Sequence, residues 1–212
     1  MTLNNFKNVL ILAPHTDDGE LSAGGTLSLL LENNASVYYV AFSTANESVP
    51  EGLPDDILKT EVRNATRKLG IKQENLILFD YQVRQLNFHR QEILEDLIVL
   101  RNKVPFDLVF MPSLNDIHQD HLTVAQEGLR AFKSTTILGY ELIWNNLTFN
   151  TTCFVKLKEH HLLNKINALK EYKSQTHRDY FTAEFIKSLA ITRGVQIGAQ
   201  YAEAFEVIRW VM

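Results

Sequence analysis

Two short segments of the chain carry the side chains that could do chemistry. Residues 14–19 (PHTDDG) hold one imidazole and two carboxylates, and residues 118–121 (HQDH) hold two imidazoles and a carboxylate. Imidazole nitrogen and carboxylate oxygen are donors that suit Zn²⁺, and a catalytic zinc site uses three protein ligands with one open position. Each segment alone has a plainer explanation, because Asp17 and Glu20 fit a helix capping box and the histidine pair could lie on the surface. Together the segments favour a metal site.

Each of these segments follows a predicted buried strand. Residues 9–13 and 107–111 are short apolar runs, each closed by a proline. In the commonest doubly wound order, 3-2-1-4-5, strands one and four are neighbours, and ligands bind at the crevice between their carboxyl ends. The six ionisable side chains of the two segments would then meet in one crevice. A divalent cation would offset the cost of bringing them together.

The rest of the chain alternates strand-like apolar runs with helical, mostly amphipathic segments. This rhythm predicts an α/β, Rossmann-like fold with a mostly parallel sheet and helices on both faces, in one domain over residues 1–212. The last third is less regular. Further strands are expected at 36–42, 76–79, 135–140, 151–157 and 205–211, and helices at 20–33, 58–69, 90–103, 122–133, 158–172 and 181–192.

Composition excludes several classes of protein. The net charge of −4 and the pI near 6.0 do not indicate a nucleic-acid partner. No segment approaches the about 18 apolar residues of a transmembrane helix, and the N-terminus has no signal-peptide pattern. The single cysteine, Cys153, excludes an internal disulfide, is expected in the core, and fits a reducing, cytoplasmic location. No G-x-G-x-x-G follows the first strand, which argues against a dinucleotide-binding domain.

The residues around both segments resemble those of a known family, the LmbE-like or PIG-L de-N-acetylases. Residues 13–18 and 118–121 resemble the paired His-Pro-Asp-Asp and His-x-Asp-His motifs of that family. Members that resemble this sequence are zinc hydrolases that remove acetyl from N-acetylglucosamine-type sugars on a Rossmann-like fold. The likeness continues along the chain in residues 24–26 (GGT), 61–70 (EVRNATRKLG), 168–175 (ALKEYKSQ), 193–194 (RG) and 201–205 (YAEAF).

This resemblance implies a role for each residue of the two segments. It predicts a zinc-dependent hydrolase of an N-acetylated amino sugar or its conjugate, in which an aspartate takes a proton from the attacking water and a histidine helps to hold the oxyanion. The alternatives are an amidohydrolase of another acyl group, such as formyl, and a sugar-binding domain with a vestigial metal site. The implied zinc ligands are His15, Asp18 and His121, the general base is Asp17, and the supporting or charge-stabilising groups are His118 and Asp120.

The chain departs from the family pattern at two positions of the candidate site. Thr16 replaces the usual proline, which loosens the turn but removes no ligand. Asp116 stands where some members have a tyrosine that helps to polarise the carbonyl. Neither departure changes the expected ligand set.

Several features stay undecided at this stage. Glu203 could contact the substrate or anchor the C-terminus, and a role for His177 at the rim is not favoured. His160 and His161 are expected to be solvated on a helix. Residues 43–54 and 81–88 are expected to form the pocket rims, but their composition names neither the sugar nor its linkage to lipid, nucleotide or polymer. A homo-oligomer is compatible with the sequence.

Overall fold

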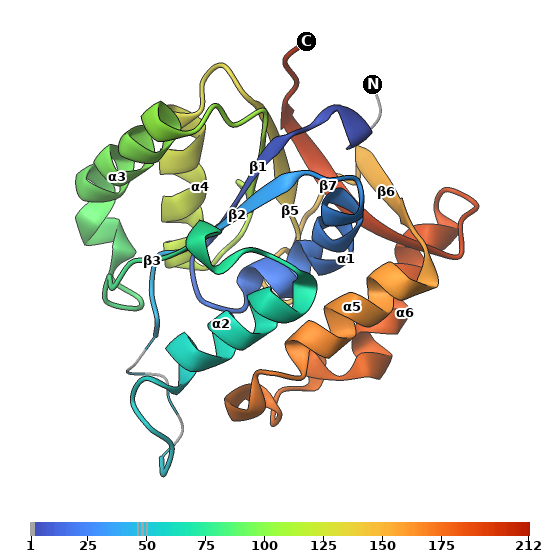
Figure 1. Ribbon diagram of the computed structural model, residues 1–212, viewed down its shortest axis with the longest axis horizontal. Coiled ribbons are helices and arrows are strands. Elements are labelled where there is room, and N and C mark those ends of the chain that lie inside the picture. The colour runs from blue at the N-terminus through green and yellow to red at the C-terminus, as the bar shows by residue number, and fades with distance from the viewer. Residues whose placement is uncertain (1–2, 46, 48, 50) are drawn as a thin grey trace.

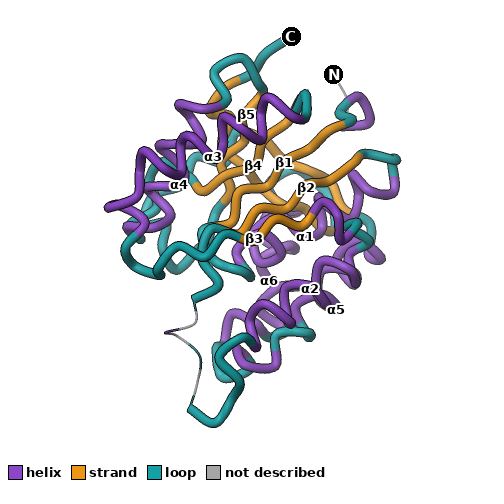
Figure 2. Tube along the Cα trace, turned by 60° about the vertical axis from the view of Figure 1, so that its left-hand side comes forward, coloured by secondary structure: helices purple, strands orange, loops and turns teal. Residues whose placement is uncertain are grey.

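The chain folds around one mixed β-sheet, seen in a computed structural model that describes residues 3–45, 47, 49 and 51–212 (Figures 1 and 2). The seven strands lie in the order β3-β2-β1-β4-β5-β7-β6. β1 to β5 are parallel, and β7 runs antiparallel to both β5 and β6. The predicted order 3-2-1-4-5 is therefore confirmed. The strands are β1 (Asn8–Ala13), β2 (Ser36–Ala41), β3 (Leu76–Leu78), β4 (Leu108–Pro112), β5 (Thr136–Tyr140), β6 (Cys153–Leu157) and β7 (Tyr201–Arg209).

Helices cover both faces of this sheet, as predicted. α3 and α4 pack on one face, and α1, α2, α5 and α6 pack on the other (Figure 1). The α-helices are α1 (Asp18–Glu32), α2 (Ile57–Leu69), α3 (Arg90–Lys103), α4 (Gln119–Ala131), α5 (Glu159–Leu169) and α6 (Ala183–Val195). Short 3₁₀ helices are η1 (Leu3–Asn5), η3 (Gln73–Asn75), η4 (Leu86–His89), η5 (Lys173–Gln175) and η6 (Asp179–Phe181).

The central strand β1 is apolar because it is covered on both sides. Val9 and Ile11 join the core under α1, whereas Leu10 and Leu12 join the core under α3 and α4. Alternate side chains of a strand point to opposite faces, so a strand buried on both faces reads as a continuous apolar run. β1 lies between β2 and β4 and pairs with β4 in parallel. The loops that leave β1 and β4 therefore start side by side.

A close helix contact fixes α1 against the C-terminal part of the chain. A Cβ atom on Gly24 would lie 2.8 Å from Cγ of Lys165, so the glycine allows α1 and α5 to approach. The buried carboxylate of Glu203 on β7 accepts hydrogen bonds from the N–H groups of Gly25 (3.0 Å) and Thr26 (2.6 Å). Lys165 Nζ donates to the same carboxylate at 2.7 Å. Glu203 thus anchors the C-terminal strand.

Two local features differ from the sequence-based expectation. α4 begins at Gln119 rather than Leu122, because His118 acts as its N-cap; this places His121 in the first turn of the helix. Cys153 is half-buried rather than in the core.

In the described part of the chain, no helix is long and apolar enough to cross a membrane.

Candidate metal and catalytic site

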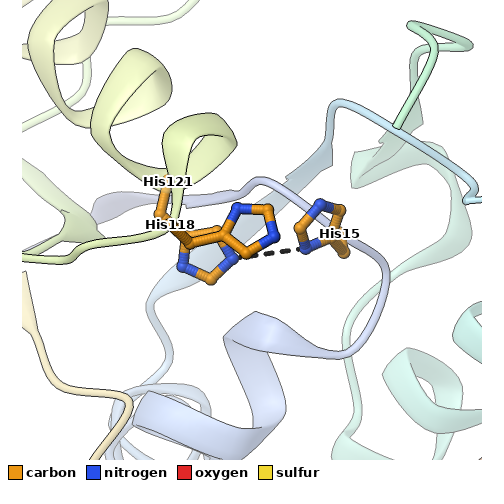
Figure 3. A group of neighbouring side chains, drawn as sticks. All are labelled: His15, His118 and His121. Atoms are coloured by element: carbon orange, nitrogen blue, oxygen red, sulfur yellow. Dashed lines mark hydrogen bonds between the residues drawn. The ribbon is translucent and has the colours of Figure 1, made fainter. Parts of the chain in front are cut away.

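The loops after β1 and β4 bring both predicted segments to one crevice at the carboxyl ends of the strands. The ring centroid of His15 lies 5.0 Å from that of His118 and 5.1 Å from that of His121 (Figure 3). We call the group the strand-end cluster. It consists of His15, Asp17, Asp18, His118, Asp120 and His121.

The turn after β1 presents two adjacent carboxylates to different places. Asp17 is the N-cap residue of α1, but its side chain makes no capping hydrogen bond within the described part of the chain. The capping-box explanation of this turn is therefore wrong, and Asp17 lines the pocket instead. Asp18 opens the helix, and its Oδ2 accepts a hydrogen bond of 2.8 Å from the backbone N–H of His15.

Three donor atoms of the cluster form a nearly equilateral triangle. His15 Nδ1 lies 3.2 Å from His121 Nε2, and Asp18 Oδ2 lies 3.3 Å and 3.4 Å from these two nitrogens. Zinc ligands at about 2.0–2.1 Å in tetrahedral geometry are separated from one another by about 3.3–3.4 Å. The triangle therefore has the size of one face of a tetrahedral zinc site.

The opposite nitrogens of both histidines contact carboxylates, which fixes the hydrogen positions. His121 Nδ1 lies 2.8 Å from Asp116 Oδ2, and His15 Nε2 lies 3.0 Å from Asp120 Oδ2. A carboxylate only accepts, so these nitrogens carry hydrogens, and in a neutral imidazole the other nitrogen presents its lone pair. Such carboxylate-backed imidazoles are typical of metal ligands. Asp116, which the sequence left without a role, orients His121.

His118 is arranged differently from the other two histidines. All three rings lie close enough to share an ion. His118 Nδ1, however, accepts the backbone N–H of Asp120 at 3.2 Å as the cap of α4. In the neutral ring Nε2 then carries the hydrogen, so His118 can donate from Nε2. Burial, together with His121 and His15, lowers the pKa of His118 to about 4, which keeps the ring neutral at pH 7.

The electrostatics of the cluster favour a positive charge between His15 and Asp18. Burial lowers the pKa of His15, but hydrogen bonds to Asp120 and Asp18 outweigh burial and raise that pKa to about 10. Burial raises the pKa of Asp18, but His121 and His15 outweigh it and lower that pKa to about 2. Burial and the neighbouring Asp18 raise the pKa of Asp17 to about 6. These shifts favour a protonated His15 beside an ionised Asp18.

A buried network that the sequence did not reveal supports the turn. Tyr39 Oη accepts from the N–H of Gly19 at 3.1 Å and lies 2.5 Å from a carboxylate oxygen of Glu20. Tyr172 donates to the carbonyl of Thr16 at 2.6 Å. Burial raises the pKa of Glu20 to about 8. These contacts hold the turn in place where the family usually has a proline, because they connect the turn to β2 and to the segment after α5.

A pocket of about 360 Å³ opens above the cluster. Of the expected rims, Ala45, Val83 and Arg84 line it, while residues 46, 48 and 50 lie outside the described residues. The other side comes from the C-terminal third, which carried no recognisable pocket motif. The pocket-lining residues from this third of the chain are Trp144, Asn145, Gln175, Arg178 and Tyr180.

The two family-like stretches at residues 61–70 and 168–175 contact each other in the structure. The buried carboxylate of Glu61 on α2 accepts the N–H of Ser174 at 2.9 Å and its hydroxyl at 2.5 Å. This contact holds the segment that carries Gln175 into the pocket. His177, two residues further on, is exposed and is not among the lining residues.

A second group of histidines lies away from the pocket. Glu32 at the end of α1, with His160 and His161 at the start of α5, forms what we call the helix-end cluster. His161 is buried, with 1% of its surface exposed, so the expectation that both histidines are solvated is wrong for this residue. Both Nε2 atoms lie 2.6 Å from Oε2 of Glu32.

Comparison with known proteins places these features in a family. Residues 10–132 match the PIG-L family model, described as GlcNAc-PI de-N-acetylase. The chain is 24% identical over 230 residues to the diacetylchitobiose deacetylase of Thermococcus kodakarensis, covering 97% of this chain and 84% of that protein.

Solved structures share the fold. An N,N'-diacetylchitobiose deacetylase from Pyrococcus horikoshii superposes with a TM-score of 0.81 at 22% identity, over 97% of this chain and 85% of that one. The 4-carboxy-2-hydroxymuconate hydratase of Pseudomonas putida reaches a TM-score of 0.80 at 18% identity, over 97% and 98%. The fold alone therefore does not select a reaction. The family match spans more than half of the chain and contains both site segments, and the chain belongs to the PIG-L family.

Proposed function

We propose that the protein is a zinc-dependent hydrolase that removes the N-acetyl group from an N-acetylglucosamine-type amino sugar or its conjugate. The observation that carries this proposal is the triangle of metal-type donors, backed by two carboxylates, at the base of an open pocket. The similarity to a diacetylchitobiose deacetylase supports the substrate class.

In this proposal the metal is held by His15 Nδ1, Asp18 Oδ2 and His121 Nε2. Their mutual distances of 3.2–3.4 Å suit a tetrahedral ion with one open position. Zinc bound to these donors would lower the pKa of a coordinated water to about 7 and polarise the amide carbonyl. His118 is not a ligand in this assignment, because its Nδ1 lone pair is used by the cap of α4.

Asp17 is the proposed general base. It lines the pocket beside Asp18 but forms no cap hydrogen bond within the described residues, so its carboxylate is available. Burial with Asp18 raises the pKa of Asp17 to about 6, and the positive charge of a zinc ion would lower that pKa again, so that Asp17 would be an ionised carboxylate able to accept a proton at pH 7. Asp17 takes a proton from the attacking water and returns it to the nitrogen as the C–N bond breaks, which releases acetate and the free amine.

His118 and Asp120 have different supporting roles in this scheme. His118 donates a hydrogen bond from Nε2 to the acetamide oxygen, where negative charge develops during attack. Asp120 is fully buried and accepts hydrogen bonds from His15 Nε2 (3.0 Å), Arg84 N (2.6 Å) and Leu86 N (3.3 Å). With its oxygens engaged in this way, Asp120 positions His15 rather than exchanging protons with substrate.

The experiment that tests the proposal is acetate release from a panel of N-acetylated sugars by purified protein with measured zinc content. We expect acetate and a free amine in equal amounts, and loss of activity with a chelator that zinc reverses. Formate from N-formyl sugars in preference to acetate would assign a different acyl group. Binding of the sugars with no hydrolysis at full zinc occupancy would favour the sugar-binding domain with a vestigial site.

A further inference from the structure

Two arginines from different loops line the pocket above the strand-end cluster. Arg84 follows β3 and Arg178 follows α5, and both side chains are exposed. The chain as a whole carries a net charge of −4. The pocket lining therefore places two guanidinium groups opposite the carboxylates of Asp17 and Asp18 in a chain that is acidic overall.

Arg84 is held in place by the strand-end cluster itself. Its backbone has a φ of 66°, a left-handed conformation that favours glycine and is costly for a longer side chain. The N–H of Arg84 donates to Asp120 Oδ2 at 2.6 Å, and the same oxygen lies 3.0 Å from His15 Nε2. The hydrogen bond that Arg84 N–H donates to Asp120 thus supports the strained backbone, and it fixes this loop relative to the proposed metal ligand.

Arg178 rests on an aromatic pair at the pocket wall. Its guanidinium carbon lies 5.7 Å from the ring centroid of Tyr180, and Nη1 donates to the hydroxyl of that tyrosine. The ring of Tyr180 stacks on Trp144, with centroids 3.9 Å apart and planes at 16°. The side chain of Arg178 is therefore oriented beside the pocket.

Neither of these arginines forms an ion pair with a carboxylate in the described part of the chain, whereas other arginines do. Arg90 and Arg130 both contact Glu127, at 2.6 and 2.5 Å, and Arg193 contacts Glu141 at 2.6 Å. Arg101 and Arg209 donate instead to the main-chain carbonyls of Ala131 and Phe132. The two pocket arginines keep donors for a partner from outside the chain.

We propose that Arg84 and Arg178 bind an anionic group, a carboxylate or a phosphate, that the substrate carries in addition to its N-acetyl amino sugar. This inference rests on the proposed function. A guanidinium matches the geometry of both anions and stays charged at all working pH values. The acetamide would lie at the strand-end cluster and the anion at the arginines, within the same pocket of about 360 Å³.

The test compares substrates that differ only in charge. The probes are the methyl glycoside of N-acetylglucosamine, its 1-phosphate and its carboxymethyl glycoside, with kcat/KM measured from acetate release. Loss of one charge-assisted contact corresponds to about a ten- to hundredfold change in rate. We expect at least one anionic probe to exceed the neutral one by that factor, and added salt to reduce the advantage. The better of the two anionic probes identifies the anion.

Variants then assign the effect to the two arginines. Arg84→Gln and Arg178→Gln should each lower the ratio of anionic to neutral kcat/KM about tenfold, while Arg67→Gln, an exposed arginine on α2 outside the pocket lining, should leave the ratio unchanged. If Arg84→Gln does not fold, Arg84→Asn replaces it, because asparagine tolerates the left-handed backbone.

Calorimetric binding of the three probes to wild-type protein gives a readout that does not depend on turnover. Equal affinities and equal rates for charged and neutral probes would overturn the inference, as would an unchanged ratio in both variants. Failure of the proposed function looks different, because no probe would then release acetate. Selective binding of the anionic probes, lost in the variants, would still support the arginine subsite in that case.

Discussion

The two histidine clusters of this chain differ in where their hydrogens lie. In both clusters three side chains come close enough to share a metal ion. In the strand-end cluster, the outer nitrogens of His15 and His121 donate to carboxylates, so that in the neutral rings the inner nitrogens carry the lone pairs. In the helix-end cluster, Nδ1 of His161 accepts the backbone N–H of Lys158 at 3.1 Å. The hydrogen on that ring is then at Nε2, and it donates to Glu32.

The two clusters also differ in the solvent exposure of their side chains and in the charges around them. The helix-end carboxylate, Glu32, has 42% of its side chain exposed and also receives Lys158 Nζ at 3.3 Å. Glu32 already accepts hydrogen bonds from Lys158, His160 and His161, and a cation would have to displace these donors. The strand-end donors Asp18 and His121 are nearly inaccessible, and the group behind His121 is the carboxylate of Asp116 instead of a cation. The proposed metal site therefore rests on inward lone pairs that are backed by hydrogen-bond acceptors, and not on the proximity of histidines alone.

The largest effect expected from this comparison is on metal content. His121→Ala removes one of three proposed ligands and should lose most of its zinc and essentially all activity. His161→Ala, the matched change in the helix-end cluster, should keep both, because His161 offers no lone pair to a metal. Elemental analysis, with circular dichroism as the check on folding, measures the difference.

Two outcomes would contradict this reading of the clusters. A folded His121→Ala protein that carries a full equivalent of zinc would show that the ligand set is wrong. A loss of zinc in His161→Ala would show that the helix-end cluster binds metal after all.

The next largest effect separates the adjacent carboxylates. Asp17→Asn keeps the size of the side chain but cannot accept a proton, so it should retain zinc and lose about 10²–10⁴ in kcat, the range for a positioned general base. Asp18→Asn should lose zinc, because the amide replaces a charged ligand. Zinc content and kcat of both variants are measured side by side. If Asp17→Asn keeps most of its turnover, the base lies elsewhere, and Asp120 is the next candidate.

His118 offers the sharpest test of the hydrogen positions within the strand-end cluster. His118 is the proposed donor to the developing oxyanion, so His118→Ala should lower kcat by a factor of about 10²–10³ and retain zinc. A stability measurement accompanies this variant, since His118 also caps α4. Loss of zinc in His118→Ala, together with zinc retained in His121→Ala, would mean that the two histidines have exchanged roles.

The predictable part of this molecule is the part that local patterns encode. The apolar run at 9–13 and the helix–strand alternation indicated a doubly wound sheet, and the commonest order of such a sheet, 3-2-1-4-5, is the one observed. That order brings residues 14–19 and 118–121 together, because parallel strands end at the same edge. The site followed from the fold, since its residues lie directly after two neighbouring strands.

The unpredicted part depends on packing between distant segments. His161 is polar and lies in a helix with other polar residues, so no pattern showed that the end of α1 buries it. Asp116 contacts His121, which lies five positions later in the chain. The D-x-H-x-x-H spacing of residues 116–121 could have suggested this contact. Arg178 and Trp144 reach the pocket from the C-terminal third, where no motif marks them.

The smallest expected effect concerns the helix-end cluster and is a pH dependence of stability. Hydrogen bonds from His160 and His161 lower the pKa of Glu32 to about 2, from an ordinary value of 4.5. A carboxylate whose pKa is lower in the folded state than in the unfolded state stabilises the fold above the unfolded pKa and loses that contribution as the pH falls toward the folded pKa.

Glu32→Gln should therefore lower the melting temperature slightly at pH 7, and the gap to wild type should narrow between about pH 5 and pH 2, because the unfolded carboxylate takes up a proton near its ordinary pKa of 4.5 and the folded one only near 2. Zinc content and turnover should not change, because α1 carries Glu32 at its far end and the strand-end residues at its beginning. Thermal melts of both proteins across this pH range provide the measurement. A gap that stays constant with pH would mean that Glu32 acts through shape rather than charge, and a fall in zinc content would remove the distinction between the two clusters.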